Sequence, residues 1–191
     1  METTGEKGGY GYRFYPDKVK GEGLFIGCVQ KNDGGNYVRP RSKRAAPERL
    51  NKKEEDLVRN WVETDYPLSF FRHEDHCYGF PQHLTDDLIV LQASCYLKRA
   101  GVLMGKPAAR EFIPEHDLAL SSLISRQLPS ISFSREQAIQ YLRKEEVHAD
   151  TTHRGWALAQ YRGQNLGWIK VLPNRINNYY PKEWRILKRD D

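Results

Sequence analysis

The chain of 191 residues has 39% hydrophobic and 12% aromatic residues, which is enough for one large or two small packed domains. This composition excludes general disorder. The sequence contains no apolar run of about 18 residues and no N-terminal signal segment, so we expect a cytoplasmic protein without membrane contact. The three cysteines, Cys28, Cys77 and Cys95, are scattered and odd in number, which favours a reducing compartment over a disulfide framework.

Basic residues are concentrated in two segments, although the net charge of the whole chain is only +5. Residues 31–49 contain six basic and two acidic residues, and residues 154–189 contain eight basic residues and one acidic residue. The remainder of the chain is therefore net acidic. Segregation of positive charge in this way is typical of proteins that bind polyanions. The alternative is that these charges only keep the protein in solution.

The first 50 residues are predicted to contain one hairpin and one linker. Residues 1–9 are polar and glycine-rich and are expected to lack regular structure. Residues 10–15 and 23–29 are predicted to form a β-hairpin. A lone hairpin is not stable in water, so we expect it to be the end of a domain that lies elsewhere. Residues 32–50 are rich in glycine, proline and basic residues and are predicted to be a linker.

Residues 51–105 are predicted to form a small intermediate domain of mixed α and β structure. Asn51 and Glu54 have the spacing of a capping box, which predicts a helix over residues 52–63. Turn residues separate the apolar runs that follow, so we expect a small antiparallel sheet. Its strands are predicted at residues 68–71, 77–80, 88–91, 94–97 and 102–104.

Residues 106–191 are predicted to combine short helices with a small β-barrel. One helix is predicted over residues 115–124 and a second over residues 134–143, where Ser134 and Gln137 have capping spacing. The chain as a whole is thus predicted to be of the α+β class. The strands of this last part, of which the second and third form a hairpin, are predicted at residues 131–133, 156–161, 166–172 and 183–187.

The stretch 166–185 is unusually rich in aromatic and basic residues. Alternation in its strand puts Leu166, Trp168, Lys170 and Leu172 on one face, and a stiff extended loop follows the strand. Such a surface suits RNA, because Lys and Arg contact phosphates while flat rings are available for bases. The alternative is that the Trp and Tyr rings fill the core of a small barrel and that the Lys and Arg side chains are simply solvated.

Residue types with catalytic or metal chemistry do not form a recognisable motif. The segment His73-Glu74-Asp75-His76-Cys77 contains metal-binding residue types, but zinc sites require separated pairs of ligands. It is therefore predicted to be a polar turn between two strands. The glycines of residues 5–9 lack the preceding strand and the following helix of a phosphate-binding loop. No catalytic or metal-binding residue is predicted.

Several short motifs carry a resemblance to a known family. Residues 13–17 (RFYPD) and 21–26 (GEGLFI) resemble the last hairpin of the catalytic domain in the Sun/nucleolar-protein family of RNA cytosine-C5 methyltransferases. Residues 106–123, 166–170 (LGWIK) and 178–182 (NYYPK) resemble the C-terminal module of the RsmF-like branch, which methylates small-subunit ribosomal RNA. That module is PUA-like, a small RNA-binding β-barrel that follows a small intermediate domain.

The sequence also departs from the family pattern. Asn177 stands where the family has a lysine, and Glu183-Trp184-Arg185 replaces the usual Gly-Leu-Arg. The functional cysteines of the family lie in Pro-Cys and Thr-Cys motifs, and neither dipeptide occurs in this sequence. The glycine-rich S-adenosylmethionine loop is absent as well. The resemblance therefore implies a C-terminal region that has no cofactor and does not methylate by itself, with S-adenosylmethionine expected in a missing core.

The resemblance implies a division of the chain into four parts. These are a terminal β-hairpin of the missing methyltransferase core (1–31), a basic linker (32–50), the small intermediate domain (51–105) and a PUA-like RNA-binding domain (106–191). A monomeric chain that binds small-subunit ribosomal RNA is expected. Charge and resemblance together predict RNA contacts by Lys106, Arg110, Arg154, Arg162, Trp168, Lys170, Arg175, Asn178, Tyr180, Lys182 and Arg185.

A protein-interaction module is the alternative function. In that case the aromatic surface docks a partner chain instead of stacking on bases. The salt dependence of binding separates the two hypotheses, because phosphate contacts release counterions and protein docking largely does not.

Overall fold

The computed structural model describes residues 2–4, 10–18, 20–27, 47–108 and 111–188. The chain divides into two compact units, residues 1–39 and 40–191, which are described separately below. The helices and strands of the two units confirm the predicted α+β class. None of the helices in the described ranges is long and apolar enough to cross a membrane.

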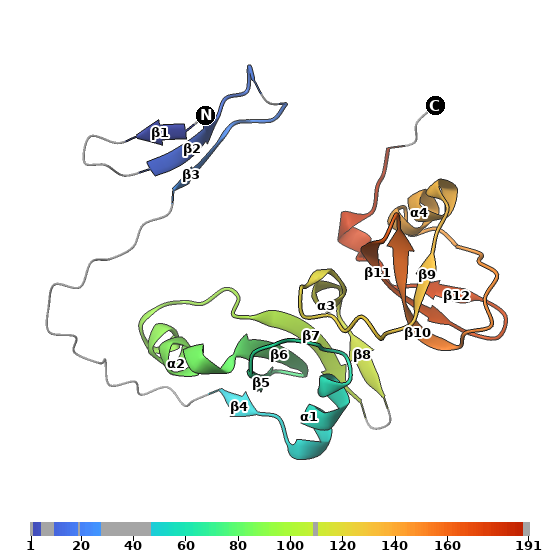
Figure 1. Ribbon diagram of the computed structural model, residues 1–191, viewed down its shortest axis with the longest axis horizontal. Helices are drawn as coiled ribbons and strands as arrows, with labels where there is room; N and C mark the ends of the chain where they lie inside the picture. Colours follow the sequence, from blue (N-terminus) through green and yellow to red (C-terminus); the bar gives the residue numbers. More distant parts are fainter. Residues whose placement is uncertain (1, 5–9, 19, 28–46, 109–110, 189–191) are drawn as a thin grey trace, which may run out of the picture. The chain divides into compact units, whose positions relative to one another are not determined.

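The first unit is a three-stranded antiparallel sheet with the order β1-β2-β3 (Figure 1). The predicted hairpin is present as β2 (Tyr10–Phe14) and β3 (Leu24–Gly27). β1 (Glu2–Thr4) pairs with the other edge of β2, so the expectation that residues 1–9 lack regular structure is wrong at this strand. Gly23, just before β3, has a φ of 86°, which residues with a side chain rarely adopt.

The second unit contains two sheets, and the first of them has the antiparallel order β4-β5-β6-β7-β8. Its strands are β4 (Glu48–Arg49), β5 (Leu68–His73), β6 (His76–Pro81), β7 (Val102–Pro107) and β8 (Phe112–Pro114). The helical elements between and after these strands are α1 (Lys52–Arg59), the 3-10 turn η1 (Gln82–Leu84), α2 (Thr85–Ser94) and α3 (His116–Leu120).

Three of the predicted strands of this sheet are confirmed, namely those at residues 68–71, 77–80 and 102–104. The polar segment after β5 is a tight turn into β6, as predicted. β8 was not predicted, and β4 lies within the predicted linker 32–50. The linker residues 32–46 lie outside the described residues. Glu48 pairs with Arg72 of β5, which places β4 at the edge of the sheet. The sequence does not indicate this strand, because an edge strand needs few apolar residues of its own.

Helix α1 begins where the capping pattern predicted. The Asn51 side chain accepts a hydrogen bond from the Glu54 backbone N–H, and the Glu54 carboxylate accepts one from the Asn51 backbone N–H. The helix ends at Arg59, four residues before the predicted end. After it, the Glu63 backbone N–H donates to the Leu123 carbonyl (2.8 Å), so tertiary pairing replaces the last helical turn.

Residues 85–94 form helix α2, so the strand predicted at residues 88–91 is wrong, and residues 94–97 are not a strand either. A short apolar run has no clear period, and it fits a buried strand as well as a helix. Asp86 and Asp87 lie in the first turn, where carboxylates complement the helix dipole. Leu88 is the residue that α2 buries.

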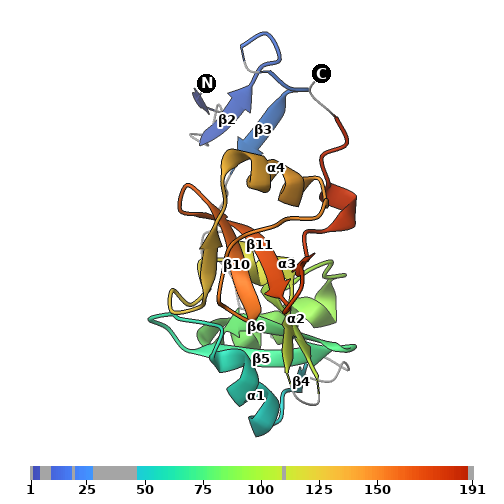
Figure 2. The ribbon, with the colours of Figure 1, turned by 90° about the vertical axis from the view of Figure 1, so that its right-hand side faces the viewer.

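The second sheet of this unit has the order β12-β11-β10-β9 and occupies the region predicted as the PUA-like barrel. β10 and β11 form the predicted hairpin (Figure 2), while β9 pairs with β10 in parallel. Helix α4 has the predicted capping box between Ser134 and Gln137. The elements are β9 (Ser130–Ser132), α4 (Arg135–Leu142), β10 (Gly155–Tyr161), β11 (Gln164–Val171), β12 (Ile176–Asn178) and the 3-10 turn η2 (Lys182–Trp184).

Three sequence expectations for this region are corrected. Residues 176–178, expected to begin an extended loop, form β12 and pair with β11. Residues 183–187, expected to be a last strand, instead include part of η2 and an extended segment. α3 ends at Leu120 rather than at residue 124. The first two corrections concern which segment pairs with β11. The tertiary fold decides this pairing, and it selects residues 176–178.

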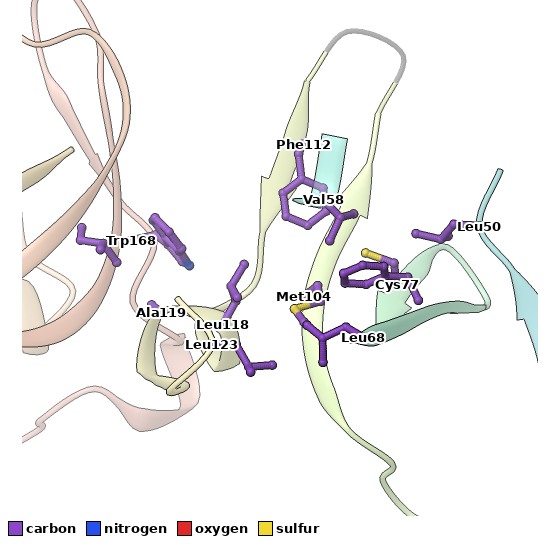
Figure 3. Close-up of a cluster of buried hydrophobic side chains, with 12 residues drawn as sticks. Leu50, Val58, Leu68, Cys77, Met104, Phe112, Leu118, Ala119, Leu123 and Trp168 are labelled. Atoms are coloured by element: carbon purple, nitrogen blue, oxygen red, sulfur yellow. The ribbon is translucent and has the colours of Figure 1, made fainter. Parts of the chain in front are cut away.

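The two sheets of the second unit share a hydrophobic core around Trp168 (Figure 3). The Trp168 ring lies 5.3 Å from the Trp61 ring in an edge-to-face arrangement, and its Nε1–H donates to the Glu115 carbonyl (2.9 Å). Figure 3 shows it pointing toward Leu118 of α3. The boundary predicted between residues 105 and 106 falls inside β7 and therefore does not separate two cores.

A second core, on the opposite face of β10 and β11, contains Tyr141 from α4 and Ile169 from β11. The hairpin is thus buried on both faces. Strict alternation predicted Leu166 on the same face as Trp168, but Leu166 packs against the second core. The pairing shifts by one residue between Gly167 and Asn165, which inserts Leu166 as a β-bulge and changes the face that it occupies.

Candidate RNA interface

Three of the predicted RNA contacts have structural roles in the fold. Trp168 is 1% exposed, so its ring cannot stack on a base in the folded protein. Asn178 uses its side chain inside the fold, where Nδ2 donates to the carbonyls of Tyr141 (2.9 Å) and Glu145 (3.2 Å) and Oδ1 accepts from the Tyr180 N–H (2.9 Å). Tyr180 is half-buried, and its ring packs edge-on against Tyr141 at 5.4 Å.

Two of the predicted lysines already have carboxylate partners. Lys170 Nζ contacts both carboxylate oxygens of Glu111, at 3.0 and 2.7 Å, and lies 5.2 Å from the centre of the Trp156 ring. The ion pair with Lys170 lowers the pKa of Glu111. Lys106 lies in β7 of the first sheet and pairs with Asp75 at 2.5 Å. Arg110 lies outside the described residues.

Arg154 and Arg175 line one groove of about 390 Å³ at the open end of the β10–β11 hairpin. Arg154 is exposed, and its Nη1 donates to the backbone carbonyls of Thr151 (3.2 Å) and His153 (2.7 Å). These bonds hold the guanidinium group in place at the surface. Arg175 is exposed in the turn between β11 and β12, where its carbonyl accepts from the Leu172 N–H (2.8 Å).

The groove has polar walls that the sequence analysis did not identify. Gln137, His148 and Asn174 line it beside the two arginines, and Asp150 contributes one acidic group. The two arginines together with the Asn174 amide can bind a phosphate backbone, since Arg and Asn side chains both make phosphate contacts in protein–nucleic acid complexes. Charge and resemblance predicted the two arginines as RNA contacts, but no local pattern in the sequence predicted that Gln137, His148 and Asn174 lie beside them.

Arg162 lies at the other end of the hairpin, in the turn that joins β10 to β11. It has a φ of 50°, and its guanidinium group lies 5.3 Å from the centre of the Tyr161 ring. The seven residues of β10 separate it from Arg154, which corresponds to roughly 20 Å at the rise of an extended strand. Arg162 therefore does not belong to the groove.

Lys182 and Arg185 are exposed on the C-terminal segment that contains η2. This segment is fastened to α4, because the Ile186 N–H donates to the Leu142 carbonyl at 3.0 Å. Trp184 lies between these two basic residues, and its ring meets His116 edge-on at 5.2 Å. The structure thus holds both side chains on an ordered support.

The described residues show no fit to S-adenosylmethionine or to a metal ion. A glycine-rich loop between a strand and a helix is the element expected for this cofactor. The connections that lead from β4 to α1, from β6 to α2, from β8 to α3 and from β9 to α4 contain no glycine. Within the described part of the chain, no group of His, Cys, Asp and Glu residues is arranged to hold a metal ion. No step of methyl transfer follows from these residues.

Comparison with known proteins confirms the resemblance to the RsmF-like methyltransferases. Residues 128–186 match the family model described as the Methyltransferase RsmF PUA domain. The chain is 24% identical over 180 residues to Ribosomal RNA small subunit methyltransferase F of Shewanella loihica, covering 88% of this chain and 36% of that protein. It is 22% identical over 177 residues to the protein of the same name from Aliivibrio salmonicida, covering 88% and 37%. The chain thus spans about a third of the length of these relatives.

Proposed function

We propose that this chain binds ribosomal RNA of the small subunit and positions it for an S-adenosylmethionine-dependent cytosine-C5 methyltransferase core. The groove that contains Arg154 and Arg175 is the observation that carries the proposal. It lies within the residues that match the PUA domain model, and its two cations come from different strand ends. Phosphate contacts of this kind set the position of the RNA but do not read its sequence.

The RNA contacts of the proposal are exposed arginines and lysines in the connections of the second sheet and in the C-terminal segment that follows it. Arg154 and Arg175 bind phosphates in the groove, while Lys182 and Arg185 extend the contact along the C-terminal segment. Arg162 contacts a different part of the RNA, because it lies at the far end of the hairpin. Lys170 acts in the fold through Glu111 rather than on the RNA.

The first unit supports the part of the proposal that concerns the core. Leu24, Phe25 and Ile26 are consecutive residues of β3, and each is more than half exposed. Because neighbouring side chains of a strand point to opposite faces, both faces of β3 are apolar and uncovered within this unit. Strands with this pattern belong in sheets that helices cover on both faces. We therefore propose that β1, β2 and β3 complete the sheet of the methyltransferase core.

Salt-dependent RNA binding tests the first part of the proposal. Arg154→Ala and Arg175→Ala are expected to weaken binding of a small-subunit ribosomal RNA fragment without changing the unfolding temperature. Each variant should reduce the slope of log affinity against log salt by about 0.7–0.9 for each phosphate group that the protein no longer binds. Arg126→Ala is the matched control, since this exposed arginine lines a different pocket together with Glu63 and Asp65.

Two outcomes would contradict this assignment. Affinity that does not respond to salt would favour the alternative, a module that docks a partner protein. Equal losses of affinity in Arg154→Ala, Arg175→Ala and Arg126→Ala would mean that only total charge matters and that the groove is not a site.

Hydrogen exchange tests the second part of the proposal. Amides of β2 and β3 are expected to exchange fast in the chain by itself, because no core covers them, while those of β10 and β11 exchange slowly. Adding a methyltransferase core of the same family should slow exchange in β3. Equal protection of β3 and β11 in the chain alone would show that the first unit is already complete.

A further inference from the structure

A cavity of about 500 Å³ in the second unit contains none of the residues predicted to bind RNA. Phe71 of β5 and Tyr78 of β6 lie opposite each other in the sheet and line it. Their rings are stacked, with 5.5 Å between the centroids and 10° between the planes. One side of the cavity therefore includes a flat aromatic pair. The segment 95–100, which joins α2 to β7, forms another side.

Tyr96 lines this cavity from the connecting segment and is 91% exposed. Burial of an aromatic side chain is favourable, so a ring that stays in water beside an aromatic wall is available to a ligand. The side chain has a phenol group that can also form a hydrogen bond. Tyr96 thus offers a second flat surface beside the first.

Three basic side chains and one acidic side chain, Glu48, line the same cavity. Arg72 lines it and is held by Glu54 at 2.5 Å and by Glu48 at 3.9 Å. Arg99 also lines it and is fixed by an ion pair with Asp117.

Lys98 lines the cavity as well, is exposed, and has no hydrogen-bond or ion-pair partner among the described residues. Lys98 is therefore the cation of this site that can bind an anion without breaking an existing pair. Arg72 and Arg99 are neutralised by their carboxylate partners, so Lys98 supplies the uncompensated positive charge.

We propose that this cavity binds an unpaired nucleotide of RNA. The base stacks on Tyr96 near the Phe71–Tyr78 pair, and the phosphate lies near Lys98. Single-stranded RNA is recognised by this combination, because unstacked bases lie on aromatic rings while lysine and arginine contact the backbone. A duplex does not fit the site, since its bases are already stacked on each other. The inference rests on the proposed function and adds a site for single-stranded RNA outside the PUA match, which begins at residue 128.

The volume agrees with a ligand of this size. Sites for small molecules and cofactors measure about 300–1,000 Å³, and a single nucleotide is a ligand of that class. The mixed character of the lining agrees as well. An apolar peptide segment would cover Lys98 without giving it a polar partner, whereas a nucleotide supplies both a flat base and an anion.

Variants of Tyr96 and Lys98 test the inference by fluorescence anisotropy with a labelled 12-nucleotide oligouridine. Tyr96→Ala is expected to weaken binding roughly 5- to 150-fold, the range that corresponds to removal of one base stack. Lys98→Ala is expected to weaken binding and to reduce the salt slope by about 0.7, the value for one phosphate on a single strand. Tyr66→Ala and Lys53→Ala are the matched controls, because both residues are exposed and neither lines the cavity. The affinity for a blunt-ended duplex should not change in either test variant.

Cys95 provides an independent readout because it is exposed and lines the cavity. Oligouridine is expected to slow its alkylation several-fold, as measured by peptide mass spectrometry, while the duplex leaves the rate unchanged. Cys77 is the internal reference, since burial raises its pKa to about 12 and keeps the thiol unreactive.

The outcomes separate this inference from the proposed function. If Tyr96→Ala binds oligouridine like Tyr66→Ala and Cys95 is not protected, the inference is wrong. If Arg154→Ala and Arg175→Ala still weaken binding of ribosomal RNA in that case, the proposed function stands without it. Equal protection of Cys95 by the duplex would also overturn the inference, because it would show that stacking on an unpaired base is not required.

Discussion

Replacement of Trp168 by alanine is expected to destabilise the second unit strongly. The ring is 1% exposed, meets Trp61 edge-on, and donates its Nε1–H to the Glu115 carbonyl at 2.9 Å. A Trp→Ala change at a buried site costs about 3–5 kcal/mol, and part of that cost is the cavity left behind. For a domain of about 150 residues this change lowers the unfolding temperature by ~6–20 °C.

The measurement is thermal unfolding followed by far-UV circular dichroism, which does not depend on tryptophan fluorescence. Trp184→Ala is the matched control, since its ring is 57% exposed and its removal should cost less than about 1 kcal/mol. Trp168→Phe separates the ring from its hydrogen bond. It keeps most of the apolar volume and should cost roughly 0.5–1.5 kcal/mol, because the Glu115 carbonyl loses the indole donor but still accepts from the Leu118 N–H at 3.1 Å.

The same experiment tests whether the two sheets of the second unit form one cooperative structure. Leu158 and Trp168 of the second sheet share a core with Phe112 of β8 and Leu118 of α3. The second unit should therefore unfold in a single transition. Equal unfolding temperatures for Trp168→Ala and Trp184→Ala would refute the role of Trp168, and separate transitions for the two sheets would refute the shared core.

Four further predictions concern the same unit and the cofactor. Gly167→Ala should lower the free energy of unfolding in urea by about 1–3 kcal/mol, because an added Cβ would lie 2.4 Å from the Tyr141 hydroxyl and 2.7 Å from His116 Nδ1. An unchanged free energy of unfolding would contradict this close packing. Lys170→Ala should leave the RNA affinity and its salt slope nearly unchanged, since Glu111 already neutralises the lysine. Burial lowers the pKa of His116, so the unfolded state binds the proton more readily. The resulting stability is fully present above the unfolded pKa of about 6.5 and is lost as the pH falls toward the lowered folded pKa. Urea unfolding at pH 7.5 and 5.5 should therefore show a smaller drop in the free energy of unfolding for His116→Gln than for the unchanged chain. Calorimetry with S-adenosylmethionine should detect no binding to this chain, and measurable heat would reveal a cofactor site among its residues.

Local sequence signals determined much of the secondary structure. The capping boxes at Asn51 and Ser134 each involve residues three apart, so they do not depend on the rest of the fold, and both helices begin where expected. The β10–β11 hairpin followed from alternation and a glycine turn for the same reason. The resemblance to the RsmF-like enzymes was also readable from the chain alone, and the comparisons confirm that resemblance.

The tertiary structure decided which face of an element is buried and which charges are paired. Alternation placed Trp168 and Lys170 on one face of β11, but it could not indicate that one ring enters a core between two sheets while the neighbouring amine meets Glu111, 59 residues away in the sequence. The grouping of Arg154 with Arg175 likewise requires the register of three strands. These contacts join residues distant in the chain, and their energy depends on packing and solvent exclusion, which no local pattern of residues contains.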